Sequence, residues 1–337
     1  MLRNLASVPI RVVVTGARGK SSLTRLLHAG LAACGLKVCA RITGVLPRAL
    51  FSPPYEERVI RRASPANIGE MRWWLGQIPG DTQAIVVENS AVAPELQNFA
   101  ARLLSPTLAI WTTVRPDHIE AWGPGREGAA RTLIRGIPAG IPVAGGPDLL
   151  RPPLPELLRG NGNALHTPDV PEDAEHNEAN RALALLACGL CMPGFDKNAV
   201  FSALESLPPD MADFRILENG GDELAVAFSA NEPESTELLF RETGWNAHET
   251  SLLYHHRPDR IARLDGFLPW IASRAWREVA FTRSDRPFFS SGRGIVWNDA
   301  VDSPDAFRRW WKGRGRVFAC GNVAGWPMKF LEEVRIS

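Results

Sequence analysis

The chain lacks an excess of charge of either sign. Its 337 residues include 38 lysines and arginines and 37 aspartates and glutamates, so the formal net charge is +1. Binding to nucleic-acid backbones or anionic membrane surfaces needs a basic excess, and we expect neither as the main partner. Cysteine is scarce as well, with five residues. An odd, scattered set does not form a disulfide framework and indicates the reducing cytoplasm.

Long apolar runs are also missing. The longest uncharged stretch, 182–195, is shorter than the roughly 20 residues that span a bilayer. The first seven residues are too few and too weakly apolar for a signal peptide, so we expect no membrane segment in this chain. A hydrophobic fraction of 45% and a charged fraction of 22% are typical of a globular protein, and the length suggests about two domains.

Two local patterns each allow two interpretations. Cys188 and Cys191 form a C-x-x-C pattern that could be a redox or half-zinc site. Without a second such pair, buried packing is favoured. The pairs Trp73-Trp74 and Trp310-Trp311 could stack bases or sugars. Helical spacing instead favours one packed and one half-exposed indole in each pair.

Short apolar runs alternate with helical patterns in the first part of the chain. We expect strands at 11–14, 84–87 and 107–112, and helices after residue 20 and at 176–191. The segment 145–171 is rich in proline, glycine and asparagine and should form loops and short turns. Alternating strands and helices predict a mostly parallel sheet that binds ligands at the carboxyl ends of its strands.

The run Leu207-Pro208-Pro209-Asp210 interrupts this pattern. We place a domain boundary there, which gives domains at 1–209 and 210–337. Beyond it, strands expected at 225–229, 251–255, 278–281 and 316–319, with a helix at 234–242, predict a second, smaller α/β domain. No internal repeat or low-complexity segment is present.

The first expected strand leads into a glycine loop and then a helix. The sequence Gly16-Ala17-Arg18-Gly19-Lys20-Ser21 has the spacing G-x-x-G-K-S, and Val14 stands where the longer P-loop has its first glycine. Glycines let backbone N–H groups approach phosphate oxygens at a helix N-terminus. Lys20 would contact the β- and γ-phosphates and Ser21 would ligate Mg²⁺. The alternative is a plain glycine turn with an exposed lysine.

A second group of residues follows two other strands. Glu88 lies just after the run 84–87, and Asp117-His118 lies a few residues after the run 107–112. In a parallel sheet both would project over the same edge as the loop, where they could hold Mg²⁺ against phosphate oxygens. Taken alone, His118 is more typical of a hydrogen-bonding loop residue.

These motifs together resemble the Mur ligase superfamily. The quartet Asp-His-Ile-Glu at 117–120 and the helix 176–182, similar to that superfamily's H-N-x-x-N-x-x-A pattern, add to the loop and Glu88. Over nearly the whole chain the sequence resembles the ATP-dependent ligase subunit of poly-γ-glutamate synthases. The matching residues are 18–21, 24–25, 43–44, 67–70, 91–95, 117–118, 123–124, 208–210, 230–231, 235–236, 257–260 and 321–322.

The resemblance implies a fold, cofactors and site residues. The fold would be α/β: a Mur-ligase-like central ATPase domain with a mostly parallel sheet, and a smaller Rossmann-like C-terminal domain. The cofactors would be ATP and Mg²⁺. The implied nucleotide-binding residues are Gly16, Ala17, Arg18, Gly19, Lys20, Ser21, Ser22, Asn180 and Arg215. The implied metal ligands are Ser21, Glu88 and His118, and the catalytic set is Lys20, Glu88, His118 and Arg215. Arg215 would reach ATP from the second domain and make catalysis depend on domain closure.

The implied reaction is ATP-dependent amide formation through an acyl phosphate, with an amino acid or glutamyl peptide as substrate. An acidic substrate needs cations, and each candidate arginine could instead be a solvated surface residue. The candidate substrate residues are Arg41, Arg61, Arg62, Asn67, Glu70, Asn231, Arg257, Arg260 and Asn322. Asn67 and Glu70 could bind an amino group or cap a helix.

Three departures from the pattern keep alternatives open. Leu133 stands where many Mur ligases have a carbamylated lysine; the poly-γ-glutamate subunits also lack that lysine, so this departure supports the resemblance to them. Val226-Ala227-Phe228 replaces an Asp and a Lys. The usual hydrophobic anchor is also missing from the sequence. The same mechanism could therefore join a different acid and amine, or the chain could be a nucleotide-binding regulatory subunit of a membrane polymerisation complex. Recruitment by a membrane partner and homo-oligomer formation are left open, and the short loop disfavours a P-loop kinase.

Overall fold

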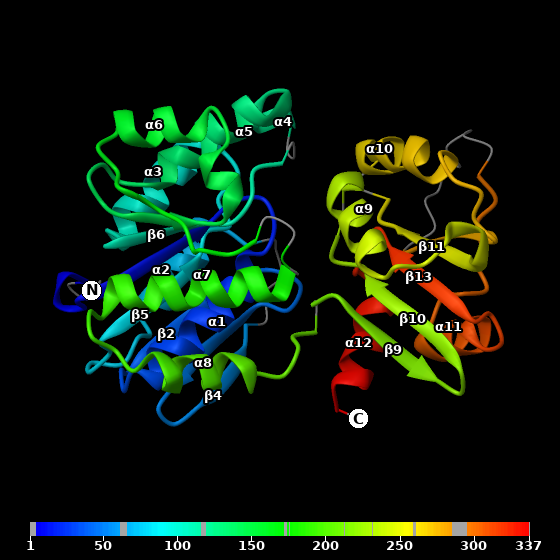
Figure 1. Cartoon of the computed structure of the whole chain (residues 1–337), viewed down its shortest axis with the longest axis horizontal. Coiled ribbons are helices and arrows are strands. Elements are labelled where there is room, and N and C mark those ends of the chain that lie inside the picture. Colours follow the sequence, from blue (N-terminus) through cyan, green and yellow to red (C-terminus); the bar gives the residue numbers. More distant parts are fainter. Residues whose placement is uncertain are drawn as a thin grey trace. The chain divides into compact units, whose positions relative to one another are not determined.

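In a computed structural model of the chain, the described residues are 5–60, 66–115, 119–171, 174, 176–211, 213–230, 232–258, 261–284 and 295–336. They form two compact units, Met1–Pro208 and Pro209–Ser337. The division falls between the two prolines of the run 207–210, where helix and strand patterns stop. Each unit is a sheet covered by helices (Figure 1).

The first unit contains an eight-stranded sheet. Its spatial order is β4 (Glu56–Val59), β3 (Arg48–Ser52), β2 (Val38–Ile42), β5 (Ala84–Glu88), β1 (Ile10–Thr15), β6 (Leu108–Trp111), β7 (Val143–Gly145) and β8 (Leu165–His166). Only β3 runs antiparallel to its neighbours, and the other pairings are parallel. The prediction of a mostly parallel sheet is confirmed, and the loop after β1 lies at the carboxyl edge near the centre of the sheet.

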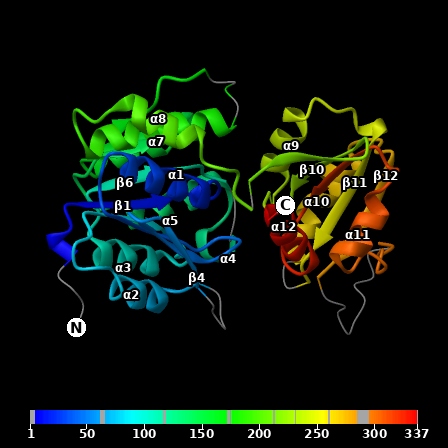
Figure 2. The same ribbon diagram turned by 90° about the horizontal axis from the view of Figure 1, so that it is seen from below.

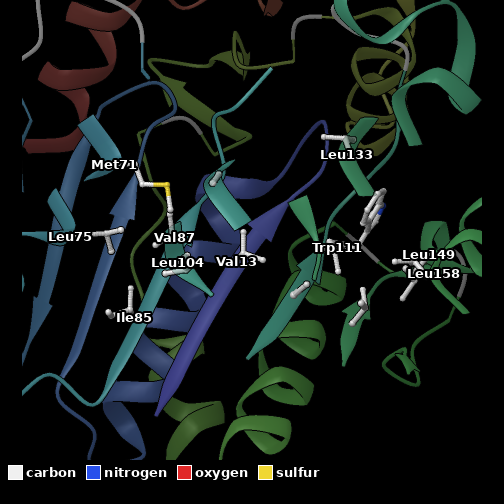
Figure 3. Packing of buried hydrophobic residues seen from close by; sticks show 14 of the residues in the cluster. Val13, Met71, Leu75, Ile85, Val87, Leu104, Trp111, Leu133, Leu149 and Leu158 are labelled. Carbon is white, nitrogen blue, oxygen red and sulfur yellow. The ribbon is translucent and has the colours of Figure 1, made fainter. Parts of the chain in front are cut away.

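Helices cover both faces of this sheet because its strands are apolar on both sides (Figure 2). Val12 and Val14 pack with α1 (Lys20–Ala33), α7 (His176–Cys191) and α8 (Lys197–Glu205). Val13 lies in the cluster on the opposite face (Figure 3). The helices on that face are α2 (Ile68–Leu75), α3 (Pro94–Leu104), α5 (Gly125–Leu133) and α6 (Leu154–Gly160), with the short α4 (Ile119–Trp122) before α5.

The structure corrects two of these expectations and confirms two others. The segment 145–171 is not only loops, because it contains α6 and β8; Leu154 and Leu158, fully buried one turn apart, hold that helix on the core. For Trp73-Trp74 the prediction holds, with exposed fractions of 56% and 2%. For Trp310-Trp311 it is wrong, since both indoles are buried and stack near the Phe307 ring. Cys188 packs in the core as expected.

The second unit contains a five-stranded sheet. Its order is β12 (Glu278–Arg283), β11 (Thr250–His256), β13 (Arg316–Cys320), β10 (Asp222–Ala227) and β9 (Arg215–Asn219). Only β9 is antiparallel to its neighbour. Phe240 of α9 (Pro233–Glu242) and Phe267 of α10 (Ile261–Ala272) pack with Phe318 on one face. Phe307 of α11 (Pro304–Trp311) contacts Trp326 of α12 (Trp326–Ile336) at a ring-centroid distance of 4.7 Å.

No helix within the described ranges combines the length and the apolar character needed to cross a lipid bilayer.

Candidate active site

The glycine loop between β1 and α1 has a backbone conformation that favours glycine at two positions. Gly16 has φ +128°, and a Cβ there would lie 2.2 Å from Thr112 Oγ1 and 2.9 Å from the Thr113 carbonyl oxygen. Gly19 has φ +82° and forms the N-cap of α1 without a side-chain cap. The segment that follows β6 holds the loop, because Thr113 O accepts from Ala17 N (2.7 Å) and Thr113 Oγ1 accepts from Arg18 N (3.0 Å). The loop is therefore shaped by its neighbours, with the N-terminus of α1 free of a side-chain cap.

Lys20 is folded back over this loop. Its Nζ donates to the carbonyl oxygens of Gly16 (2.7 Å) and Ala17 (3.1 Å). The ammonium group therefore already lies over the loop that the sequence assigns to phosphates. An ammonium has three N–H donors, so it can exchange these carbonyl contacts for phosphate oxygens without a change in the loop.

Ser21 and Glu88 meet at the first turn of α1. Ser21 Oγ donates to Glu88 Oε2 at 2.9 Å, and Thr43 N donates to the same oxygen at 2.8 Å. Glu88 is 3% exposed at the end of β5. The pairing of Val14 with Glu88 in the β1–β5 ladder fixes this carboxylate beside the loop.

Gly44 keeps space open around this pair. A Cβ at Gly44 would lie 2.3 Å from Ser21 Oγ and 3.8 Å from Glu88 Oε1. Thr43 and Gly44 belong to the motifs that carry the family resemblance but were not predicted as site residues; a glycine just after a strand, at the carboxyl ends of the sheet, is a signal for close approach.

One hydroxyl and one carboxylate suit Mg²⁺, which binds few protein ligands and keeps water and phosphate oxygens. Across the described ranges, no cluster of three or more His, Cys, Asp or Glu side chains is arranged to hold a metal. The residues present therefore fit a nucleotide-bound Mg²⁺ held by Ser21 and Glu88 better than a metal held by the protein alone.

Several predicted site residues fall outside the described residues: Arg61, Arg62, Asp117, His118, Asn231 and Arg260. Their proposed roles stay predictions.

Arg215 begins β9 in the second unit. Its Nη1 donates to the Asp210 carbonyl oxygen at 2.7 Å. Burial lowers the pKa of this guanidinium, and the nearby Asp213 and Asp210 carboxylates oppose that shift. In the first unit, Ser22 follows Ser21 on α1, and Asn180 lies on α7, which packs against α1. Nucleotide contacts by these three residues stay predictions.

Arg41, Glu70 and Asn67 form a connected structural unit. Arg41 on β2 is fully buried, and its Nη2 lies 2.7 Å from Glu70 Oε1 on α2. Asn67 is the N-cap of α2 and accepts from Glu70 N at 3.0 Å. Of the two interpretations of Asn67, helix capping is the one observed. Asn67 and Glu70 also line a groove of about 570 Å³ together with Phe51, Arg58 and Trp73.

In the second unit, Asn322 follows β13 after Gly321, whose φ is +102°. Its Oδ1 accepts from Ala324 N at 2.8 Å, so the side chain shapes the turn. His255 at the end of β11 fixes the same turn, because its Nε2 lies 2.8 Å from the Ala324 carbonyl oxygen. Arg257, just after β11, is partly buried.

The central parallel sheet, the short glycine loop and the Ser21–Glu88 pair together have the layout expected of a nucleotide site in a Mur-ligase-like fold. A family model described as "Poly-gamma-glutamate synthase CapB C-terminal domain" matches residues 215–336. The chain is 27% identical over 294 residues to "PGA synthase CapB" of Bacillus subtilis (strain 168), covering 80% of this chain and 74% of that protein. It is 25% identical over 360 residues to "Capsule biosynthesis protein CapB" of Bacillus anthracis, covering 96% and 76%.

Solved structures show the same fold. A bifunctional folylpolyglutamate synthase/dihydrofolate synthase of Yersinia pestis, complexed with AMPPNP and Mn ion, matches with a TM-score of 0.70 and 16% identity over 98% of this chain and 88% of that one. A structure of such a bifunctional synthase with Mn, AMPPNP and L-glutamate bound gives a TM-score of 0.68 and 16% identity, covering 98% and 92%. The chain therefore has the fold of these synthases, and its sequence is similar to the two CapB proteins.

Proposed function

We propose that this chain is an ATP-dependent amide ligase of the poly-γ-glutamate synthase type. It would activate the γ-carboxylate of glutamate, or of a glutamyl chain, as an acyl phosphate for attack by an amino group, releasing ADP and phosphate. The observation that carries the proposal is the Ser21–Glu88 pair, 2.9 Å apart, beside a glycine loop whose lysine already lies over it. The names of the Bacillus subtilis relative and of the matching family model supply the glutamate chemistry.

The chain's own residues would position the nucleotide and neutralise the charge on its phosphates. Backbone N–H groups of the loop and the α1 N-terminus would hold the phosphates, and Lys20 would leave the Gly16 and Ala17 carbonyls to contact the β- and γ-phosphates. Ser21 and Glu88 would hold Mg²⁺, which when bound neutralises charge on the transferring phosphoryl group. Thr43 N–H keeps the Glu88 carboxylate in place throughout.

The reaction would then proceed in two transfers. A substrate carboxylate oxygen attacks the γ-phosphorus in line, and the bond to the β-phosphate oxygen breaks to release ADP. The acceptor amine attacks the acyl carbon, loses a proton and displaces phosphate. Because the enzyme's work is positioning and electrostatics, this scheme needs no nucleophilic side chain.

A specific observation favours a second candidate with the same mechanism and a different acceptor. The groove beside Glu70 has walls formed by Phe51, Val59 and Trp73, of which Trp73 is 56% exposed. Apolar walls suit an acceptor with an aromatic or aliphatic body better than a chain of carboxylates.

One experiment separates these candidates. The full chain is given Mg²⁺ and ATP, and ADP and phosphate are measured with single amino acids, γ-glutamyl oligomers and amines that carry apolar groups. Release that depends on glutamate or a glutamyl acceptor supports the first proposal. Release with apolar amines alone supports the second, and nucleotide binding without stimulated release in any mixture contradicts both. Replacing Mg²⁺ by Mn²⁺ and Ca²⁺ tests the metal assignment.

A further inference from the structure

A second groove lies at the amino ends of the strands in the first unit's sheet, whereas the glycine loop lies at their carboxyl ends. It has a volume of about 790 Å³ and is lined by residues that include Arg102, Ser105, Arg135 and Asn161. Ser105 precedes β6, Arg135 precedes β7 and Asn161 precedes β8, and these strands run parallel to β1. The glycine loop follows the carboxyl end of β1, so the groove, at the amino ends, is separate from the proposed catalytic site.

The groove is positively charged. Its lining includes two arginines and two asparagines and contains no aspartate or glutamate. Arg102 and Arg135 are exposed, and neither guanidinium forms an ion pair or hydrogen bond with another residue that the structure describes. Asn98, one turn before Arg102 on α3, is exposed on the same groove.

Arginines in the last turn of a helix often serve only to neutralise its C-terminal carbonyls. Here those carbonyls already have partners. Ser105, in the left-handed conformation with φ 48°, donates from N to Ala101 O (2.8 Å) and from Oγ to Arg102 O (3.2 Å). In the turn after α5 that contains Arg135, Ile137 N donates to the Ile134 carbonyl oxygen (2.9 Å). The two guanidiniums are therefore left facing the groove.

We propose that this groove binds carboxylates, and that in the ligase it holds glutamyl groups away from the catalytic edge. Two guanidiniums on separate elements, α3 and the turn after α5, suit a ligand with more than one carboxylate, because each can form charge-assisted hydrogen bonds to a different group. The same chemistry is present in free glutamate and in a γ-glutamyl chain. That the ligand is a glutamyl group rests on the proposed function. That the ligand is negatively charged rests on the groove alone.

The test measures binding without ATP, so that it does not depend on ligase activity. A γ-glutamyl oligomer carrying a fluorescent group at its amino end is titrated with the full chain, and free glutamate is tested as a competitor. We expect Arg102→Glu/Arg135→Glu to weaken oligomer binding by about tenfold or more, and added salt to weaken binding to the unaltered chain. Arg72→Glu is the control for a charge reversal outside the groove, since Arg72 lies in the last turn of neighbouring α2 and does not line the groove.

The outcomes are distinct. Tighter binding of the oligomer than of glutamate assigns the groove to the glutamyl chain, and equal binding assigns it to the free amino acid; both support the proposal. Unchanged binding in the double variant, or an equal loss in Arg72→Glu, overturns it. A photoreactive oligomer should label peptides containing residues 98–106 or 134–139. Failure of the proposed function would appear separately, as missing glutamate-dependent ADP release with binding to the groove intact.

Discussion

Replacing Glu88 by glutamine should abolish ligase turnover and leave the fold in place. The structure gives the reason atom by atom. Oε2 of Glu88 accepts both local hydrogen bonds, from Ser21 Oγ at 2.9 Å and from Thr43 N at 2.8 Å. A glutamine of the same shape can put its carbonyl oxygen at that position and keep both bonds. Its NH₂ group then takes the place of Oε1, towards Gly44.

We therefore expect Glu88→Gln to have a small effect on stability and a large effect on turnover. Hydrogen bonds to a charged acceptor contribute about 1 kcal/mol more than neutral ones, and the variant no longer buries a charge, so the two effects nearly cancel. We expect the free energy of unfolding to change by about 1 kcal/mol or less. The loss of the only metal-binding charge assigned among the described residues should lower turnover at least about a hundredfold.

The assay compares three proteins. ADP release is measured for the unaltered chain, Glu88→Gln and Glu88→Ala over a Mg²⁺ titration, and unfolding is followed by circular dichroism. Glu88→Ala should lose activity and also stability, by about 1–3 kcal/mol for each donor left without an acceptor. Turnover of Glu88→Gln within tenfold of the unaltered chain at any Mg²⁺ concentration would refute the metal assignment.

Three further predictions concern the loop and the buried histidines. Lys20→Ala should lose ADP release with an unchanged circular dichroism spectrum, and retained turnover would remove the phosphate-loop assignment. Gly16→Ala should unfold at a lower temperature because its Cβ meets an oxygen at 2.2 Å at a φ of +128°, while Gly80→Ala, with open space around it, should not. Burial lowers the pKa of His28 and of His255 from 6.5 to about 4. The unfolded chain therefore binds protons that the folded chain does not, and the free energy of unfolding should fall as the pH drops from about 6.5 towards 4. The expected loss between pH 7.5 and pH 5 is about 2 kcal/mol per histidine. Denaturant titrations at both pH values measure this, and equal stability would contradict it.

Much of the fold could be predicted because the central strands are apolar on both faces. Runs such as 11–14 and 84–87 are buried by helices on either side, so they are recognised from composition alone. The hairpin β3–β4 was missed because its strands carry Arg48, Glu57 and Arg58, and their register comes from pairing with each other and with β2. The edge strand β8 was missed because two residues carry no periodic signal.

Some features of the candidate site could likewise be predicted from the sequence, and others could not. The glycine loop is local, so it could be proposed as a phosphate cradle from adjacent residues. The Ser21–Glu88 contact joins residues 67 positions apart and needs the β1–β5 pairing. The roles of Arg41 and Asn67 could not be chosen from the sequence. The sequence looks the same whether an arginine contacts a substrate or, as here, a carboxylate on α2. Capping by Asn67 depends on where that helix begins.

The α/β class, the glycine loop and the family resemblance follow from the sequence alone, because each depends on neighbouring residues or on short ordered motifs. Tertiary structure decided which side chains meet. It set Glu88 beside Ser21, paired Arg41 with Glu70, and left Arg102 and Arg135 on one groove at the far edge of the sheet. The physical reason is that strand order and helix packing bring distant residues together through contacts spread over the whole core, and no single stretch of sequence contains that information.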